Sequence, residues 1–75
     1  MKEVLEIIAR SLVDEPEAVE VREIEGEQSV IFELKVADGD VGKVIGKQGK
    51  IAKSIRTVIK AAASRENKHA VVEIL

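Results

Sequence analysis

Apolar side chains recur along this chain in two periods, one typical of helices and the other of strands. Residues 2–13 have the helical period, because apolar positions 4, 5, 8 and 12 fall on one face of a helical wheel. The pair Glu15-Pro16 ends this stretch, since the residue before a proline is pushed out of helical geometry. The pattern therefore predicts a short amphipathic helix at the start of the chain.

Two strands are predicted next, joined by a tight turn. Residues 29–36 alternate between apolar and polar side chains, which is the period of a strand with one buried face. Residues 18–25 alternate less regularly, and the break at Ile24 indicates an edge strand or a bulge. Residues 26–28 supply the turn. The lone aromatic residue, Phe32, shares its strand face with aliphatic side chains, so we expect it in the core.

The second half of the chain predicts two helices and a last strand. Residues 38–40 stop the second strand and offer an aspartate as the N-cap of a short helix over 41–45. A longer helix follows over about 50–64, then a loop at 65–68 and an apolar strand at 70–75. On a helical wheel the longer helix has one apolar arc, made by Ile51, Ile55, Val58, Ile59 and Ala62.

The order helix, strand, strand, helix, helix, strand predicts an α+β fold. A three-stranded sheet with its helices on one face is the simplest arrangement that buries all of these apolar stripes. Seventy-five residues make a single domain, 1–75, with a small core, so dimerisation is one way for the chain to gain stability. No apolar run approaches the roughly 18 residues of a membrane span, and the first residues do not resemble a signal peptide. We therefore expect a cytoplasmic protein with no membrane partner.

The charges are segregated along the chain, although the formal net charge is only −2. Residues 1–40 carry four Lys/Arg and twelve Asp/Glu, a net charge of −8. Residues 41–60 carry six Lys/Arg and no acid, and residues 61–75 balance at zero. A basic block inside an acidic chain predicts a polyanion-binding surface on one side of the molecule, although a solvated basic helix face would give the same pattern.

A G-x-x-G turn, Gly46 to Gly49, lies between the two predicted helices and inside the basic block. Two glycines flanking two polar residues let another backbone come close, because no β-carbon stands in the way. The helix that follows directs its free N–H groups and the positive end of its dipole toward the turn, which favours a phosphate there. The alternative is a plain interhelical turn. Gly39 and Gly42 are interpreted as turn or close-packing residues rather than ligand contacts.

The predicted RNA-binding residues surround this turn. Lys47 and Lys50 would neutralise phosphates, Gln48 would hydrogen-bond to a phosphate or sugar, and Lys43 would extend the basic rim. Lys53 and Arg56 would contact flanking phosphates. Val44, Ile45 and Ile55 are candidates for an apolar groove under the bases. With the two glycines, the predicted site comprises Lys43, Val44, Ile45, Gly46, Lys47, Gln48, Gly49, Lys50, Lys53 and Arg56.

This element order, with the signature Val44-Ile45-Gly46-Lys47-Gln48-Gly49, resembles a type II KH domain. The tract 40–50, together with 61–64 and 66–68, is similar to the bacterial stand-alone KH-domain RNA-binding proteins, the KhpA family. The resemblance covers almost the whole chain. One position departs from the usual KH pattern: many KH domains place a large aliphatic residue three positions after the second glycine, where this chain has Ala52. Ile51 and Ile55 are the side chains available to fill that space.

The resemblance implies single-stranded RNA binding without catalysis, on a footprint of about four nucleotides. It also implies a role as an RNA chaperone or post-transcriptional regulator, sometimes connected with cell elongation and envelope homeostasis. Two kinds of protein partner follow from it: a second copy of the chain, as a homodimer, or a larger KH-containing protein.

Other classes of function are weighed on the same residues. An enzyme is not expected: His69 is the only histidine and is interpreted as structural, there is no cysteine, and no nucleotide-binding or metal-ligand spacing occurs. No catalytic residue, cofactor or metal is therefore predicted. A helix-turn-helix DNA binder is a closer alternative, because two helices are joined by a short glycine-bearing turn. A KH-shaped scaffold that mainly binds protein is the third.

Overall fold

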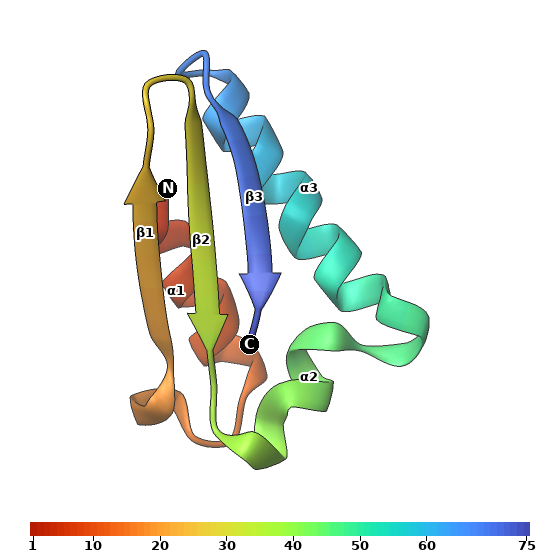
Figure 1. Cartoon of the computed structure of the whole chain (residues 1–75). Coiled ribbons are helices and arrows are strands. Elements are labelled where there is room, and N and C mark those ends of the chain that lie inside the picture. The colour runs from red at the N-terminus through yellow and green to blue at the C-terminus, as the bar shows by residue number, and fades with distance from the viewer.

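The computed structural model describes residues 1–75 and contains three α-helices and three strands (Figure 1). Each predicted helix and strand is present, within two residues at either end. Three short 3-10 turns lie at 16–18, 38–40 and 47–49. In chain order the elements are α1 Lys2–Leu12, β1 Glu20–Glu25, β2 Ser29–Lys35, α2 Val41–Ile45, α3 Lys50–Ser64 and β3 His69–Ile74.

The sheet has the strand order β1-β2-β3, with β1 and β2 antiparallel and β2 and β3 parallel. A parallel pair needs a crossover connection, and here α2 and α3 provide it. α2 lies at the end of the sheet where β2 and β3 terminate, and α3 runs back beside β3 (Figure 1). This topology places the α2–α3 turn beside the carboxyl end of the parallel strands.

Ile24 lies on β1, which is an edge strand. An edge strand was one of the two alternatives that the broken alternation predicted, and a bulge was the other. The register of β1 on β2 is continuous from Glu20 opposite Lys35 to Glu25 opposite Val30, so the strand contains no bulge. Ile24 points away from the helices and is 42% exposed, opposite Ile31 on the neighbouring strand.

The core lies between one face of the sheet and the helices α1 and α3. Phe32, the lone aromatic residue, is fully buried there, as its strand pattern predicted. The core cluster to which it belongs includes residues from every helix and strand. The helices thus cover a single face of the sheet (Figure 1). The largest fully buried side chains are Phe32, Leu5, Leu34, Ile59, Val30 and Val44.

The buried face of α3 is rotated from the predicted arc. Ile55 and Ile59 are buried as expected, but Val58 is 45% exposed. The residues that complete the buried face are Ala52 and Ala63. Ala63 belongs to the core cluster, where its small side chain allows α3 to pack closely. A helical wheel identifies clustered apolar residues, and it does not indicate which edge of the cluster meets the sheet.

Candidate nucleic-acid interface

The turn between α2 and α3 is built from residues with left-handed or glycine-only backbone geometry. Gly46 has φ 77° and ψ 172°, a combination that is essentially restricted to glycine. Gln48 and Gly49 follow with φ 58° and φ 74°. The backbone N–H of Gly49 donates to the carbonyl oxygen of Gly46 at 3.1 Å, which closes the turn. The chain is thereby redirected from α2 into α3 within four residues.

The two glycines of this turn have different functions. A β-carbon on Gly46 would lie 2.6 Å from Cγ1 of Ile51, so Gly46 allows α3 to pack against the turn. A β-carbon on Gly49 would meet nothing within 4 Å, so its missing side chain leaves open surface. The prediction that both glycines leave room for a ligand is therefore wrong for Gly46, whose open side is already filled by this protein.

Exposed polar and basic side chains surround the open side of the turn. Lys47, Gln48, Lys50 and Lys53 are all exposed. No side chain caps the N-terminus of the 15-residue helix α3, whose first N–H groups therefore lack a side-chain acceptor. A bound anion would satisfy them and would meet the positive end of the helix dipole.

The apolar members of the predicted site divide into exposed and buried residues. Ile45 is 38% exposed and can contact a ligand. Val44 is fully buried and is not available to line a groove under the bases. Ile55 is 3% exposed and belongs mainly to the core, where it forms part of the wall of a hollow between α1 and α3. This corrects the groove expectation for Val44. Val44 lies in a short apolar helix, and the sequence does not show which of its apolar residues faces the sheet.

Arg56 is held at the junction of α3 and the sheet. Its Nε donates to the carbonyl oxygen of Val72 on β3 at 3.2 Å. The side chain remains exposed, so its charge stays accessible from the solvent. Arg56 therefore connects the helix that follows the glycine turn to the outer edge of β3.

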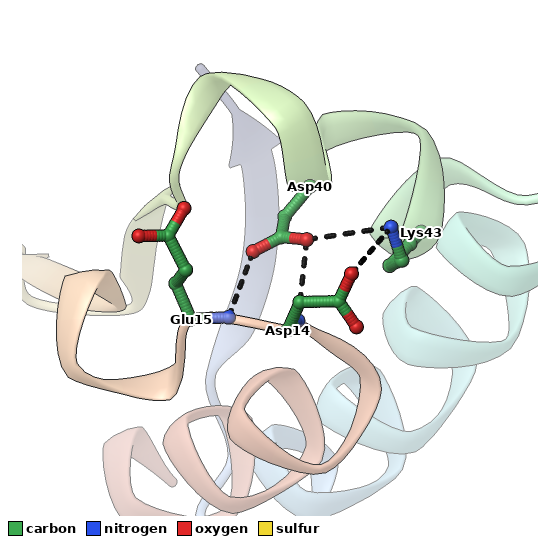
Figure 2. Close-up of polar contacts among 4 residues, drawn as sticks. All are labelled: Asp14, Glu15, Asp40 and Lys43. Carbon is green, nitrogen blue, oxygen red and sulfur yellow. Dashed lines mark hydrogen bonds and ion pairs between the residues drawn. The ribbon is translucent and has the colours of Figure 1, made fainter.

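A buried carboxylate fixes the start of α2 (Figure 2). The side chain of Asp40 is 3% exposed, and it accepts hydrogen bonds from the backbone N–H groups of Asp14, at 3.2 Å, and Glu15, at 3.1 Å. Lys43 completes the cluster, with Nζ 3.2 Å from Oδ2 of Asp14 and 3.5 Å from Oδ1 of Asp40. Asp40 therefore occupies the predicted N-cap position of α2, but its carboxylate makes no capping hydrogen bond to that helix.

This cluster shifts the pKa values of its members. Burial acts to raise the pKa of Asp40, but the two backbone donors and the Lys43 ammonium outweigh it, and the pKa of Asp40 lies below its ordinary value. The pKa of Lys43 is raised, chiefly by its hydrogen bond and charge interaction with Asp14 and further by Asp40. Lys43 is thus balanced by two carboxylates and is not a free cation of the basic rim.

Sequence reasoning missed the role of Asp40, and it had little to work with. The partners of the carboxylate are backbone N–H groups 25 and 26 residues away. Nearly every residue has such a group, so the sequence does not indicate which ones bind the carboxylate. The one available signal is an acid placed between an apolar strand and an apolar helix, where a charged side chain has few exposed positions.

Two mainly apolar hollows lie along the seam between α1 and α3. One has a volume of about 210 Å³ and the other about 400 Å³, and Val58 lines both of them. The first is lined by Ile8, Leu12, Ile51, Ser54, Ile55 and Val58, and the second by Val4, Thr57, Val58, Ala61, Ala62 and Arg65.

A metal centre and a membrane span find no support in the structure. No group of three or more His, Cys, Asp or Glu side chains is placed to hold a metal ion. None of the helices is long and apolar enough to cross a bilayer. His69, at the start of β3, lies beside a polar hollow with Lys60 and Lys68.

Comparison with known proteins gives one consistent family. The family described as "KhpA/KhpB, KH domain" matches residues 2–74. The RNA-binding protein KhpA of Clostridium acetobutylicum is 69% identical over 75 residues, covering 100% of both chains. The protein of the same name from Clostridium perfringens is 68% identical with the same coverage, and that of Aquifex aeolicus is 47% identical over 100% of this chain and 95% of its own. No solved structure gives a significant match.

Proposed function

This chain belongs to the KhpA/KhpB KH-domain family, and we propose that it binds single-stranded RNA at the turn between α2 and α3. The observation that carries the proposal is the open backbone at Gly49, where a β-carbon would meet nothing, beside the uncapped N-terminus of a basic helix. A phosphate placed there contacts N–H groups and lysine ammonium groups together.

Each exposed residue of the turn has a part in the proposed complex. Lys47, Lys50 and Lys53 neutralise phosphates, and Gln48 hydrogen-bonds to a phosphate or sugar. Ile45 offers a small apolar contact to a base. Arg56, held by Val72, presents a cation farther along α3 toward the edge of β3. The bases lie over this edge rather than over Val44 or Ile55, which are buried.

The absence of exposed aromatic side chains sets the expected strength of binding. Stacking on an aromatic ring contributes about 1–3 kcal/mol per base in other single-strand binders, and the one aromatic residue here is fully buried. Electrostatics therefore supplies most of the affinity. Neutralising three or four phosphates gives a log–log salt slope of about −2 to −3.

Fluorescence anisotropy with labelled single-stranded RNA at low salt tests the proposal. The test variant is Lys47→Asp/Gln48→Asp. The matched control is Lys35→Asp/Gln28→Asp, which makes the same charge change at exposed residues outside the turn. We expect the wild type and the control to bind and the test variant to lose binding, with circular dichroism showing all three folded. Equal binding by both variants contradicts the assignment of the turn.

The cellular role that we propose is that of a non-catalytic RNA chaperone or post-transcriptional regulator in the cytoplasm, connected with cell elongation and envelope homeostasis. Its support is the family alone. Double-stranded DNA, compared with single-stranded RNA, distinguishes a helix-turn-helix DNA binder, which places its second helix in the major groove of B-form DNA. The five residues of α2 disfavour that alternative. A protein-binding scaffold would bind RNA poorly with or without the basic residues.

We further propose that the chain self-associates through the α1–α3 seam. Val58 is 45% exposed and stands between two hollows on the same surface. Under a two-fold axis such a surface is self-complementary, because the projecting residue of each copy enters a hollow of the other. Pairing two copies also joins two short RNA sites and raises avidity. The alternative occupant is a larger KH-containing protein with a similar seam.

A further inference from the structure

The orientation of α2 cannot come from the helix itself. It has five residues, whereas isolated helices shorter than roughly 12–15 residues are marginal in water. Contacts outside the helix must therefore hold it. Val44 anchors its middle in the core, and close packing of Gly46 on Ile51 holds its C-terminal end.

Asp40 holds the other end of α2. Its two carboxylate oxygens each accept one backbone N–H, from Asp14 and from Glu15, in the segment that leaves α1 (Figure 2). Both donors belong to irregular backbone, where a buried N–H needs a partner. The carboxylate thus connects two parts of the chain that lie 25 and 26 residues apart.

We propose that Asp40 is a positioning residue for RNA binding: by binding the backbone of residues 14 and 15, its carboxylate fixes α2 and so holds the glycine turn in its RNA-binding orientation. The inference rests on the RNA-binding function proposed above. Asp40 itself does not contact RNA, since its side chain is 3% exposed. It acts through the five-residue helix that joins it to Gly46.

The direction in which Asp40→Asn changes the RNA affinity distinguishes a positioning role from a purely electrostatic one. Asp40 carries a negative charge close to a site for a polyanion. Removing that charge weakens repulsion, so electrostatics alone predicts tighter RNA binding after Asp40→Asn. Positioning predicts the opposite result, because the amide cannot accept both N–H groups and the turn then samples other orientations. If about one-fifth of the molecules keep the binding orientation, the apparent Kd rises about fivefold.

Asp38 supplies a matched control on the same short segment. It is exposed, lies two residues from Asp40, and makes no hydrogen bond or ion pair. Asp38→Asn therefore removes the same charge from nearly the same place without breaking a contact. Asp40→Glu gives a third variant, which keeps the charge but moves the carboxylate by one methylene group.

The experiment measures single-stranded RNA binding by anisotropy for the wild type, D38N, D40N and D40E at one salt concentration. We expect D38N to bind as tightly as the wild type or slightly more tightly, and D40N and D40E to bind about fivefold more weakly. If the wild type does not bind RNA, the proposed function and this inference both fail. If the wild type binds and D40N matches D38N, this inference alone fails.

Amide hydrogen exchange supplies a readout that a general loss of stability would not give. In D40N we expect faster exchange at residues 14 and 15 and at residues 46–49, with the central residues of β2 and α3 unchanged. Uniformly faster exchange over all elements contradicts a positioning role. If D38N folds but neither D40N nor D40E does, Asp40 is required for the whole fold and the inference is overturned.

Discussion

Arg56 on α3 donates a hydrogen bond from Nε to the carbonyl oxygen of Val72 on β3, at 3.2 Å. The carbonyl lies at the outer edge of the last strand, so this contact joins the helix after the glycine turn to the end of the sheet. It leaves the rest of the guanidinium group exposed. A cation whose position is fixed in this way loses less side-chain entropy when it meets a phosphate.

Two substitutions separate the charge of Arg56 from its fixed position. We expect Arg56→Lys to weaken RNA binding moderately, because it keeps the charge and loses the planar group that holds the Val72 carbonyl. Arg56→Met should weaken binding more and make the salt slope shallower by about 0.7, the value for one phosphate contact on a single strand. Equal binding by both variants and the wild type would place Arg56 outside the interface.

The two glycines of the turn should differ in their effect on stability. Gly46→Ala combines a glycine-only backbone geometry with a contact of 2.6 Å to Ile51, and we expect it to cost about 3 kcal/mol of unfolding free energy. Gly49→Ala places its methyl group in open space, so only the left-handed conformation is strained, at about 1–2 kcal/mol. Urea denaturation measures both. A larger loss for Gly49→Ala would contradict the geometry of the turn.

The same two variants should also differ in their affinity for RNA, but for a different physical reason. Among folded molecules, Gly49→Ala adds a methyl group where the ligand backbone would approach, and we expect it to weaken binding. Gly46→Ala alters the inner side of the turn and reduces the folded fraction instead. Anisotropy corrected for that fraction distinguishes the effects, and unchanged binding by folded Gly49→Ala would remove Gly49 from the proposed contact.

Gly42 should be replaceable by alanine with a gain in stability. It lies inside α2, where glycine is less favourable than alanine by about 1 kcal/mol. A β-carbon there meets nothing within 4 Å, so the expectation that Gly42 is a close-packing residue is not met within the monomer. We expect Gly42→Ala to raise the melting temperature. If the variant also loses RNA binding, the ligand approaches this helix too.

Self-association should depend on Val58 and not on other exposed valines. Val58→Asp puts a charge between the two apolar hollows, and we expect it to make the protein monomeric in sedimentation equilibrium. Val71→Asp is the matched control, because Val71 is 40% exposed on the outer face of the sheet. A wild-type chain that is monomeric at all concentrations, or a monomeric Val71→Asp variant, would argue against the seam.

The stability of the fold should fall in acid partly because of Asp40. Its pKa in the folded protein is below the ordinary value, so its contribution is present above about pH 4 and is lost as the pH falls through the lower, folded pKa. Glu3 and Glu25, whose pKa values are also lowered, act in the same direction. We therefore expect the stability difference between the wild type and D40N to shrink below about pH 4. Urea unfolding at several pH values measures it, and a constant difference would exclude the carboxylate as its source.

Local patterns predicted the elements of this fold well, because each depends on residues close in sequence. The strand around Phe32 and the short helix before Gly46 follow from alternation and from the glycine turn. The order of the elements then led to the sheet with helices on one face. Contacts between segments that are distant in the sequence could not be predicted in the same way.

Val58 and Asp40 show where the sequence is insufficient. Val58 belongs to the apolar arc of its helix, yet it is 45% exposed, and the buried face of the helix is completed by Ala52 and Ala63. Asp40 has the residue type and position of an N-cap, yet its acceptors are used by backbone groups of residues 14 and 15. In both cases the deciding partner lies on another element, and periodicity carries no information about it.

The parallel pairing of β2 with β3 has a consequence for how the protein is made. The glycine turn lies within the crossover that precedes β3, and Arg56 finds its partner on β3 itself. A growing chain on the ribosome that has emerged only as far as α3 lacks the strand against which that helix packs. We therefore expect a nascent chain to acquire the proposed RNA site only when β3 leaves the exit tunnel, so that synthesis itself delays contact with the messenger.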